Sequence, residues 1–176
     1  TSTLNSTDIS FFNNSTLVST HGGLYYLING EYNFVEGLLE YNIIDISISN
    51  NQKIWISSKN NGIIQILNDN FSLHSVINYP SYDLIKSIIY TELFTYAIGC
   101  NGDCTSDAND SSTYYLIQYD DIYQVNQISI NSLNGSNVIN DICVYDDKII
   151  LATDLGIIYS SLDDNLVYSN SWNSID

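Results

Sequence analysis

The chain lacks arginine altogether and has only four lysines, set against twenty aspartates and glutamates. Its formal net charge at pH 7 is therefore −16. Proteins hold nucleic acid and anionic membrane surfaces largely through cationic side chains, which neutralise phosphate groups. This composition excludes both kinds of partner.

Other residue types are scarce as well: the 176 residues include one proline, nine glycines, two histidines and no methionine. No apolar run approaches the roughly 20 residues that a membrane-spanning helix needs. No signal peptide is recognisable, and because an initiating Met is missing we interpret the chain as a mature form or an excised segment. The hydrophobic content of 44% is still sufficient for one folded domain with a core.

A sequence pattern that occurs four times is the most informative feature present. The clearest copy runs through residues 44–67 and contains Asp45, Trp55 and Gly62. Successive equivalent points are separated by 37, 42, 54 and 35 residues; these points are Asp8, Asp45, Ser87, Asp141 and Asp176. Periods of about 40–50 residues with four strands per unit are typical of β-propeller blades. We predict an all-β propeller of four tandem blades of four antiparallel strands, at approximately 4–42, 43–83, 84–138 and 139–176.

Short β-branched and aromatic runs between Asn, Asp and Gly turns define the expected strands. First strands are expected at 8–12, 45–49, 87–91 and 141–145, and fourth strands at 32–35, 71–77, 123–130 and 166–172. Turn glycines with positive φ are expected at Gly23, Gly62 and Gly156. Residues 82–93 also match helical spacing, but the repeat favours a strand there.

Residues 44–67 resemble the propeller repeat of the extracellular sensor regions of two-component regulators. That family has an Ile-Trp-Ile-Gly-Thr-like strand and then a Gly-Leu-x-x-Leu-like strand; here Ser57-Ser58 replaces Gly-Thr. Residues 152–160 are similar to the same motif and to sialidase-like repeats. The resemblance implies a β-propeller, with this run of four blades as part of a larger ring or, alternatively, a closed disc. It assigns no catalytic residue, and a sialidase would need the arginines that this chain lacks.

Three cysteines are present. Cys100 and Cys104 flank a tight loop that contains Asn-Gly, which favours a short disulfide in an oxidising compartment over two free thiols. Cys143 alternates with Ile142 and Val144 within a strand, and we interpret it as a small buried apolar residue.

The sequence offers no arrangement of catalytic groups. His21 lies in a turn and His74 in an outer strand, and both are interpreted as surface residues without a nucleophile to activate. Paired aspartates such as Asp146-Asp147 fall where the repeat places turns, and turn chemistry accounts for them. We therefore expect no enzyme activity, no catalytic residue and no bound organic cofactor.

The long insertion of the third unit, between Gly99 and Thr113, contains candidate metal ligands. Carboxylate and amide oxygens are the donors that Ca²⁺ prefers, although their spacing here does not match an EF-hand loop. A calcium site and a solvated loop both remain open. The candidate ligands are Asp103, Asp107, Asn109 and Asp110.

Sequons for N-glycosylation occur in expected turns or loops, where a bulky glycan can be accommodated. They lie at Asn5, Asn14, Asn70, Asn109 and Asn134. Their use depends on secretion, and both outcomes remain open.

The sequence favours a secreted or cell-surface, non-enzymatic propeller module with a binding or structural role. Because the repeated residues are those that a blade needs to fold, function is expected in non-repeating loops, above all 99–113. The alternatives are an extracellular sensor domain of a signalling receptor and a propeller-type glycosidase or lyase. The expected partners are a protein or glycan ligand, and a second copy or remaining blades of the same protein, since an unclosed ring leaves strands unpaired.

Overall fold

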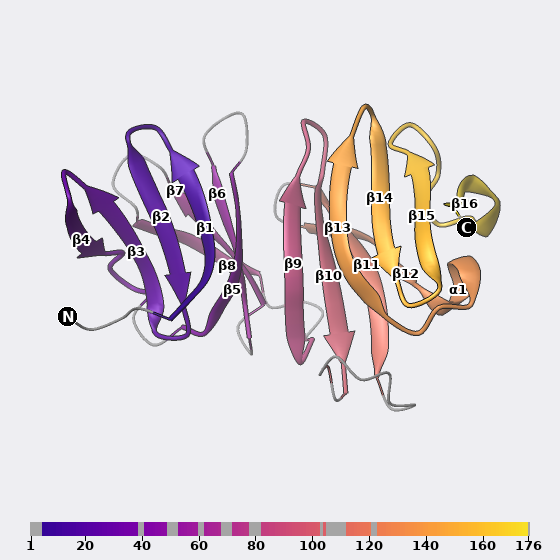
Figure 1. The fold of residues 1–176 in the computed structure, drawn as a ribbon, viewed down its shortest axis with the longest axis horizontal. Coiled ribbons are helices and arrows are strands. Elements are labelled where there is room, and N and C mark those ends of the chain that lie inside the picture. Colours follow the sequence, from indigo (N-terminus) through magenta and orange to yellow (C-terminus); the bar gives the residue numbers. More distant parts are fainter. Residues whose placement is uncertain are drawn as a thin grey trace.

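The computed structural model describes residues 5–38, 41–48, 53–59, 62–67, 72–77, 82–102, 104, 112–120 and 123–175. Its sixteen strands form four separate antiparallel sheets, each made of four strands that are consecutive in the sequence (Figure 1). The predicted all-β fold with four blades of four antiparallel strands is confirmed.

The strands of the first two blades are β1 (Ser6–Phe12), β2 (Ser15–Thr20), β3 (Gly23–Ile28), β4 (Glu31–Phe34), β5 (Ile43–Ile48), β6 (Ile54–Ser58), β7 (Gly62–Leu67) and β8 (Ser72–Ile77). Those of the last two are β9 (Leu84–Tyr90), β10 (Thr95–Asn101), β11 (Thr113–Asp120), β12 (Tyr123–Ser129), β13 (Ile139–Tyr145), β14 (Lys148–Thr153), β15 (Gly156–Ser161) and β16 (Asn173–Ile175). A short helix α1 (Asn131–Asn134) precedes β13, and a 3₁₀ turn at Ser169–Ser171 precedes β16.

Polar two-residue turns join the strands as the sequence predicts. Asp146 and Asp147 connect β13 to β14 with φ values of 50° and 59°. Left-handed conformations at both central residues match the twist of the flanking strands, and Asp and Asn tolerate them better than other side chains. The positive φ expected at the three turn glycines is also found, at 133°, 72° and 116° for Gly23, Gly62 and Gly156.

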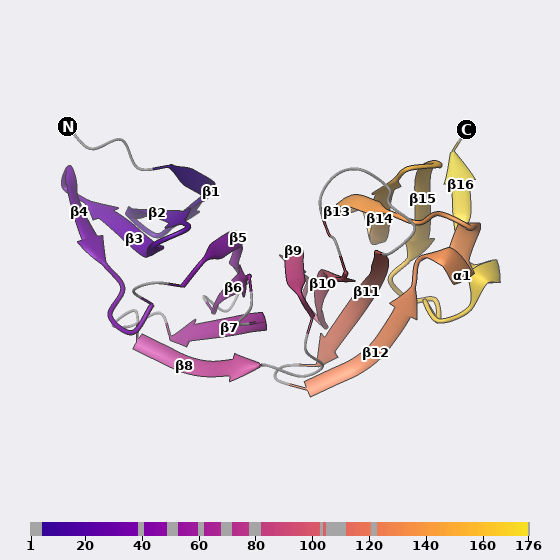
Figure 2. The same cartoon turned by 90° about the horizontal axis from the view of Figure 1, so that it is seen from below.

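The four blades stand side by side in an open arc (Figure 2). The first strands β1, β5, β9 and β13 line its concave side, and β1 packs on β5, β5 on β9 and β9 on β13. The outer strands β4, β8 and β12 lie on the convex side, and both chain ends lie at the open side. In Figure 1 the reader looks into this open side, with β7, β8, β11 and β12 behind.

Most of the hydrophobic core lies between neighbouring blades, because a single sheet cannot cover both of its own faces. The three junctions bury Leu17 and Leu24 against Ile46 and Ile56, Trp55 and Ile63 against Ile88 and Ile117, and Tyr96 and Leu116 against Ile142 and Leu151. The second and third blades therefore each have one face toward the preceding blade and one toward the following blade, whereas the first and fourth blades are covered on one face only.

The strand predicted over residues 87–91 is confirmed as β9, and the structure explains its helix-like spacing. β9 and β10 shift register between Ile85 and Ser87, so Lys86 is an extra residue in the ladder. This bulge places Ile85 and Ile88 on the same buried face although they are three residues apart.

The strand predicted over residues 166–172 is wrong. Those residues form a turn with a short 3₁₀ segment, and the fourth strand of the last blade is only β16, Asn173–Ile175. Leu166 and Trp172 are buried in the core, and the indole Nε1 of Trp172 donates to the carbonyl oxygen of Leu166 at 3.0 Å. These apolar residues are buried within a turn. Their spacing in the sequence resembles that of a strand, so the sequence does not distinguish the two structures.

Candidate functional site

The insertion of the third blade begins with the predicted disulfide. Cys100, at the end of β10, is bonded to Cys104, and their Cα atoms are 6.0 Å apart. Asp83, just before β9, holds the start of this loop: its Oδ2 accepts from the backbone N–H of Gly102 at 2.8 Å. In return Asn101 Oδ1 accepts from the backbone N–H of Asp83 at 3.1 Å. These two hydrogen bonds and the disulfide attach the start of the non-repeating loop to the third blade.

This loop borders a pocket of about 470 Å³ formed where segments of the first three blades meet. Its polar lining combines an imidazole, an amide, an ammonium group and a carboxylate. The lining residues are His21, Asn42, Ile44, Lys59, Asp83, Leu84, Gly102 and Cys104.

Two polar residues of the pocket orient each other. His21 Nδ1 and Asn42 Oδ1 are 2.5 Å apart, so the imidazole donates to the amide oxygen. The backbone carbonyl of Asn42 accepts from the N–H of Lys59 at 2.8 Å, which fixes the start of the lysine segment beside them. The arrangement presents both hydrogen-bond donors and acceptors to a ligand, with one cationic side chain at its rim.

Sequence reasoning identified the disulfide loop but missed Asn42, Lys59 and Asp83 as site residues. Asn42 and Asp83 each directly precede the first strand of a blade, and Lys59 directly follows a second strand, as His21 does. Because antiparallel strands alternate in direction, these turns lie at the same end of every blade, and the packing of the blades brings them together around one pocket. A signal was available in retrospect: Lys59 is one of only four lysines in a strongly acidic chain.

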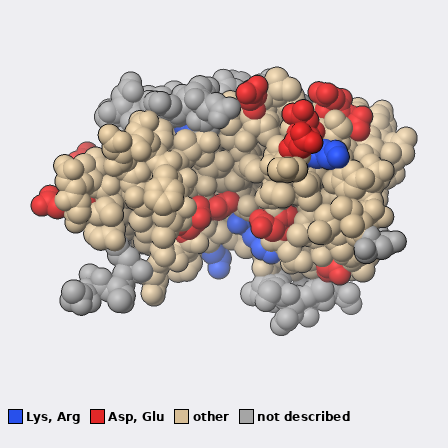
Figure 3. Space-filling view, turned by 45° about the horizontal axis from the view of Figure 1, so that its top comes forward, with Lys and Arg blue, Asp and Glu red and all other residues tan. Residues whose placement is uncertain are grey.

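The opposite end of the third and fourth blades carries a second, more acidic pair of pockets. Their volumes are about 320 and 370 Å³, and both are lined by Phe94, Leu162 and Asp163. Figure 3 shows acidic side chains gathered over this half of the molecule, beside a basic one. The buried Tyr96 lines the first of these two pockets, and its hydroxyl oxygen accepts a hydrogen bond from Gln118 Nε2 at 3.4 Å.

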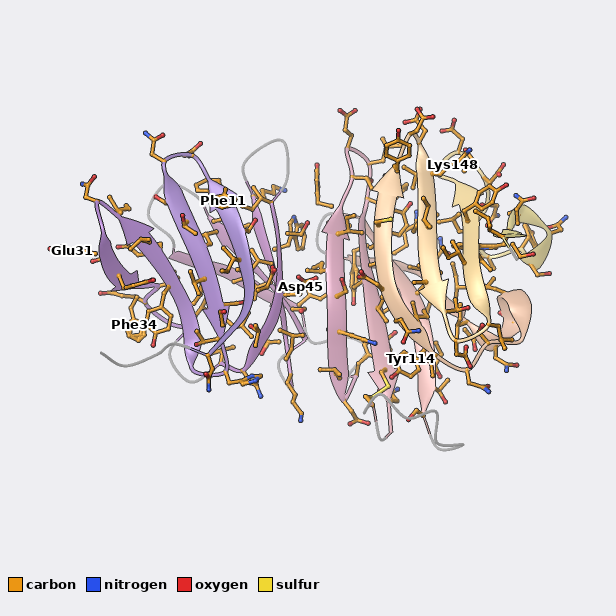
Figure 4. All side chains as sticks on the ribbon, in the orientation of Figure 1. Phe11, Glu31, Phe34, Asp45, Tyr114 and Lys148 are labelled. Carbon is orange, nitrogen blue, oxygen red and sulfur yellow. A yellow bond between two sulfur atoms is a disulfide. The ribbon has the colours of Figure 1, made fainter. Side chains whose placement is uncertain are left out.

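A carboxyl group on the inner strands has the most perturbed pKa of the described aspartates and glutamates. Burial raises the pKa of Asp45 from 3.8 to about 6, and the neighbouring charge of Asp8 adds to this. Hydrogen bonds from the N–H of Ile88 at 2.7 Å and the hydroxyl of Ser87 at 2.9 Å oppose the shift. Figure 4 shows Asp45 at the inner strands, between the two halves of the arc. Its partners are structural groups of the next blade, which explains its burial without catalysis.

Several predicted residues have a different setting in the structure or lie outside it. Cys143 is exposed, so its interpretation as a buried residue is wrong: it lies on the face of the last blade that no described blade covers. The expected calcium ligands Asp103, Asp107, Asn109 and Asp110, and the sequon residue Asn70, lie outside the described residues. Elsewhere in the described chain, no group of three His, Cys, Asp or Glu side chains could hold a metal.

Two sequon residues lie where loops were expected, and one does not. Asn5 precedes β1 and Asn14 lies in the β1–β2 turn, both exposed, whereas Asn134 ends helix α1. None of the described helices is long and apolar enough to cross a bilayer.

Comparison with known proteins gives matches among solved structures alone. No family model matches the chain, and no curated protein matches it. The computationally designed protein Ika4 is similar with a TM-score of 0.67 and 8% identity, over 92% of this chain and 93% of the design. The extracellular domain of BT4673 from B. thetaiotaomicron, described as a one-component system, has a TM-score of 0.64 and 14% identity. PorZ, a surface component of the type-IX secretion system of Porphyromonas gingivalis, has a TM-score of 0.57 and 14% identity.

The fold is that of a β-propeller. The likeness to the extracellular domain of BT4673 covers 96% of this chain and confirms the resemblance predicted from residues 44–67. The chain spans only 22% of that protein's chain and 25% of PorZ. At these identities the likeness shows the fold alone.

Proposed function

We propose that the protein is an extracellular, non-enzymatic binding module that holds a short glycan segment in the pocket beside the disulfide loop. One observation carries the proposal: the segment that departs most from the repeat supplies Gly102 and Cys104 to the largest of the three pockets described above. In a repeat protein the repeated residues build the blades, so a pocket lined by a non-repeating segment is the natural place for a specific function.

The pocket's chemistry favours a hydroxyl-rich ligand. Asn42, His21 and Asp83 offer both donors and acceptors, and Lys59 adds a single cation at the rim. A volume of about 470 Å³ accommodates a small ligand or one or two sugar units of a longer chain. The net charge of −16 disfavours polyanions, so a neutral or singly acidic sugar is the best fit.

Two findings support an extracellular setting. The Cys100–Cys104 disulfide is of a kind that persists in oxidising compartments. The similar structures include an extracellular domain and a bacterial surface component.

Binding can be tested by NMR on the 176-residue chain, because it has only two histidines. Titration with a panel of neutral and acidic oligosaccharides should shift the imidazole signals of His21 and leave those of His74 unchanged. The variant Lys59→Gln should weaken binding about tenfold, as expected for loss of one charge-assisted hydrogen bond. The matched variant Lys148→Gln, in the fourth blade, should bind normally. Equal shifts at both histidines, or equal loss in both variants, would contradict the proposed pocket.

A sensor domain is the second candidate, favoured by the likeness to the extracellular domain of BT4673. In that case the same pocket would bind the signal. Sequencing of the flanking gene region distinguishes the two roles, since a sensor requires a membrane span and a signalling module.

A further inference from the structure

The two ends of the arc expose sheet faces that are buried everywhere else in the molecule. We call the equivalent points Asp8, Asp45, Ser87 and Asp141 the reference position of each blade. In blades two to four, the residue that follows it is an isoleucine that is 7%, 4% and 6% exposed, respectively: Ile46, Ile88 and Ile142. Each packs on the preceding blade. The equivalent residue of the first blade, Ile9, is 53% exposed.

The outer face of the first blade carries a row of apolar side chains, of which Ile9 and Phe34 are 53% and 39% exposed, while Val18 between them is 7% exposed. Ile9, Val18, Tyr25 and Phe34 lie opposite one another across β1, β2, β3 and β4. The rings of Tyr25 and Phe34 stack with centroids 4.8 Å apart. Phe11, two residues beyond Ile9, is 79% exposed, and Figure 4 shows it and Phe34 on the side of the arc that faces the reader. Apolar faces of this kind usually mark an interaction site.

The far end of the arc exposes the complementary type of face. On the third blade, Leu116 and Ile128 point toward the fourth blade and are 0% and 3% exposed. Their equivalents on the fourth blade, Ile157 and Ile175, are 42% and 56% exposed. Cys143 is exposed on this same face.

A polar contact between first strands repeats along the arc. The carboxylate Oδ2 of Asp8 accepts from the backbone N–H of Ile46, in the next blade, at 3.0 Å. Asp45 Oδ2 accepts from the equivalent N–H of Ile88 at 2.7 Å. In both cases the carboxylate at the reference position of one blade accepts from a backbone N–H of the next blade. That N–H belongs to the residue directly after the next blade's reference position.

The ends of the arc carry the two halves of this contact. Asp141 is the equivalent carboxylate of the fourth blade, and its Oδ1 accepts from the N–H of Ile142 at 2.9 Å. Asp45 Oδ1 accepts from Ile46 in the same way, while its Oδ2 serves the next blade. If a first blade followed the fourth, the N–H that Asp141 would bind is that of Ile9.

A second contact follows the same rule. Here the residue before the reference position donates to a backbone carbonyl of the next blade. At the first junction Thr7 Oγ1 donates to the carbonyl of Ile43 at 2.7 Å, and at the third Lys86 Nζ donates to the carbonyl of Ile139 at 3.2 Å. On the fourth blade this residue is the exposed Asn140, whose amide is a donor. The carbonyl at the corresponding place in the first blade is that of Ser6.

We propose that a second copy of this chain closes the ring, with the Asn140–Asp141 face of each copy docked on the Ile9–Phe11 face of the other. The chain contains three junctions between blades, two of which use the carboxylate contact, and its two ends carry both halves of that contact, so two copies related by a two-fold axis would make it twice. Figure 2 shows both end faces turned to the same open side, as such closure requires. The apolar row on the first blade carries no charge, so docking desolvates no ion there.

The oligomeric state of the 176-residue chain, produced without glycosylation, tests this directly. Sedimentation over a range of concentrations should give a mass that rises to twice the 19.8 kDa of one chain and no further. Ile9→Glu should keep the chain monomeric with unchanged circular dichroism, because Ile9 is exposed in the single copy. Leu93→Glu is the matched control: Leu93 is 68% exposed in the β9–β10 turn, away from both end faces, and this variant should dimerise normally.

Three results would overturn the proposal. A chain that stays monomeric at all concentrations would mean that further blades of a longer chain, or another protein, cover these faces. Equal loss of association in Ile9→Glu and Leu93→Glu would indicate non-specific contact. Species that grow beyond two copies would exclude a closed ring.

A cross-link tests the register of docking. Ser47 Oγ accepts from the N–H of Tyr90 at 3.0 Å, across the second junction. The equivalent residues at the two ends are Cys143 and Phe11. Mild oxidation of Phe11→Cys should therefore give a covalent dimer through Cys143, the chain's one cysteine outside the disulfide. Asn33→Cys, on the opposite face of the first blade, should not; equal cross-linking by both variants would contradict the register.

Discussion

The junction between blades two and three and the junction between blades three and four bind the next first strand with different side chains. At the former, Asp45 accepts from Ile88 and Ser87. At the latter, Ser87 stands where a carboxylate would be, and Lys86 instead donates to the carbonyl of Ile139. The comparison shows that the backbone of the next first strand must be bound, while the chemistry that binds it can change. Either a carboxylate or an ammonium group can bind it, because a peptide backbone offers both a donor and an acceptor.

The largest expected difference between these junctions comes from their tryptophans. Trp55 is fully buried between blades two and three, whereas Trp172 is 9% exposed near the outer end of the fourth blade. We expect Trp55→Ala to lower the free energy of unfolding by about 3–5 kcal/mol, because it removes a large core side chain. Trp172→Ala should cost less. Urea denaturation followed by circular dichroism checks both, and a larger loss for Trp172→Ala would reverse our ranking of the junctions.

The tight packing against β10 of the third blade can be disturbed by a single methyl group. A Cβ added at Gly99 would lie 2.6 Å from Ile117 Cδ1 and 2.8 Å from Tyr82 Cδ1. Gly99→Ala should therefore destabilise the protein by about 1–3 kcal/mol. Gly22→Ala, where the nearest atom is 3.7 Å away, is the control and should be near neutral. Thermal melts of the two variants that coincide would show that the core yields more easily than these distances indicate.

The carboxylate of the second junction makes that junction sensitive to pH. Because burial raises the pKa of Asp45 from 3.8 to about 6, the folded state holds this proton more tightly than the unfolded chain. The contribution of this proton to the free energy of unfolding is full below about pH 4. It is lost as the pH rises through about 6, which lowers the free energy of unfolding by up to about 3 kcal/mol. Asp45→Asn should remove this part of the pH dependence, measured by urea denaturation between pH 4 and 7. Asp163→Asn, an exposed turn aspartate, should leave it in place, and an unchanged slope in Asp45→Asn would mean that other groups cause it.

The smallest effect is expected at the third junction, where Lys86 makes its single bond to Ile139. Burial lowers the pKa of this lysine, and Asp141 opposes the shift. Lys86→Met keeps the aliphatic part of the side chain and removes the ammonium group, whose nitrogen also lies 5.9 Å from the centre of the Tyr114 ring. Loss of one hydrogen bond should cost about 0.5–1.5 kcal/mol. Lys148→Met serves as the exposed control, and an equal loss in both variants would show that the bond to Ile139 contributes nothing.

The sequence predicted the blades because each blade's requirements are local. Isoleucine alternation, turn residues such as Asp146-Asp147 and the glycines at positive φ all act within one hairpin. The Cys100–Cys104 disulfide spans five residues, so its closure was equally visible. The prediction was wrong at 166–172, since buried residues of a turn and of a strand have the same composition, and it was ambiguous at β9, where a bulge imitates helical spacing.

The candidate site was only partly predictable. The sequence indicated the loop from Gly99 to Thr113, but His21, Asn42 and Lys59 join it through the side-by-side packing of three blades. His21 and Lys59 each directly follow the second strand of a blade, so the repeat relates their positions, but no pattern in the chain shows that these turns and the loop enclose one pocket.

By itself, the sequence determined that this chain forms propeller blades and which side chains occupy each face of each blade. The tertiary structure decided which of those faces are covered. Ile9 and Ile46 have the same place in the repeat, yet one is exposed and the other buried, and Cys143 is exposed for the same reason. The period of a strand fixes the direction of a side chain relative to its own sheet. Whether another sheet lies in that direction depends on the arrangement of the blades in space, which no local pattern contains.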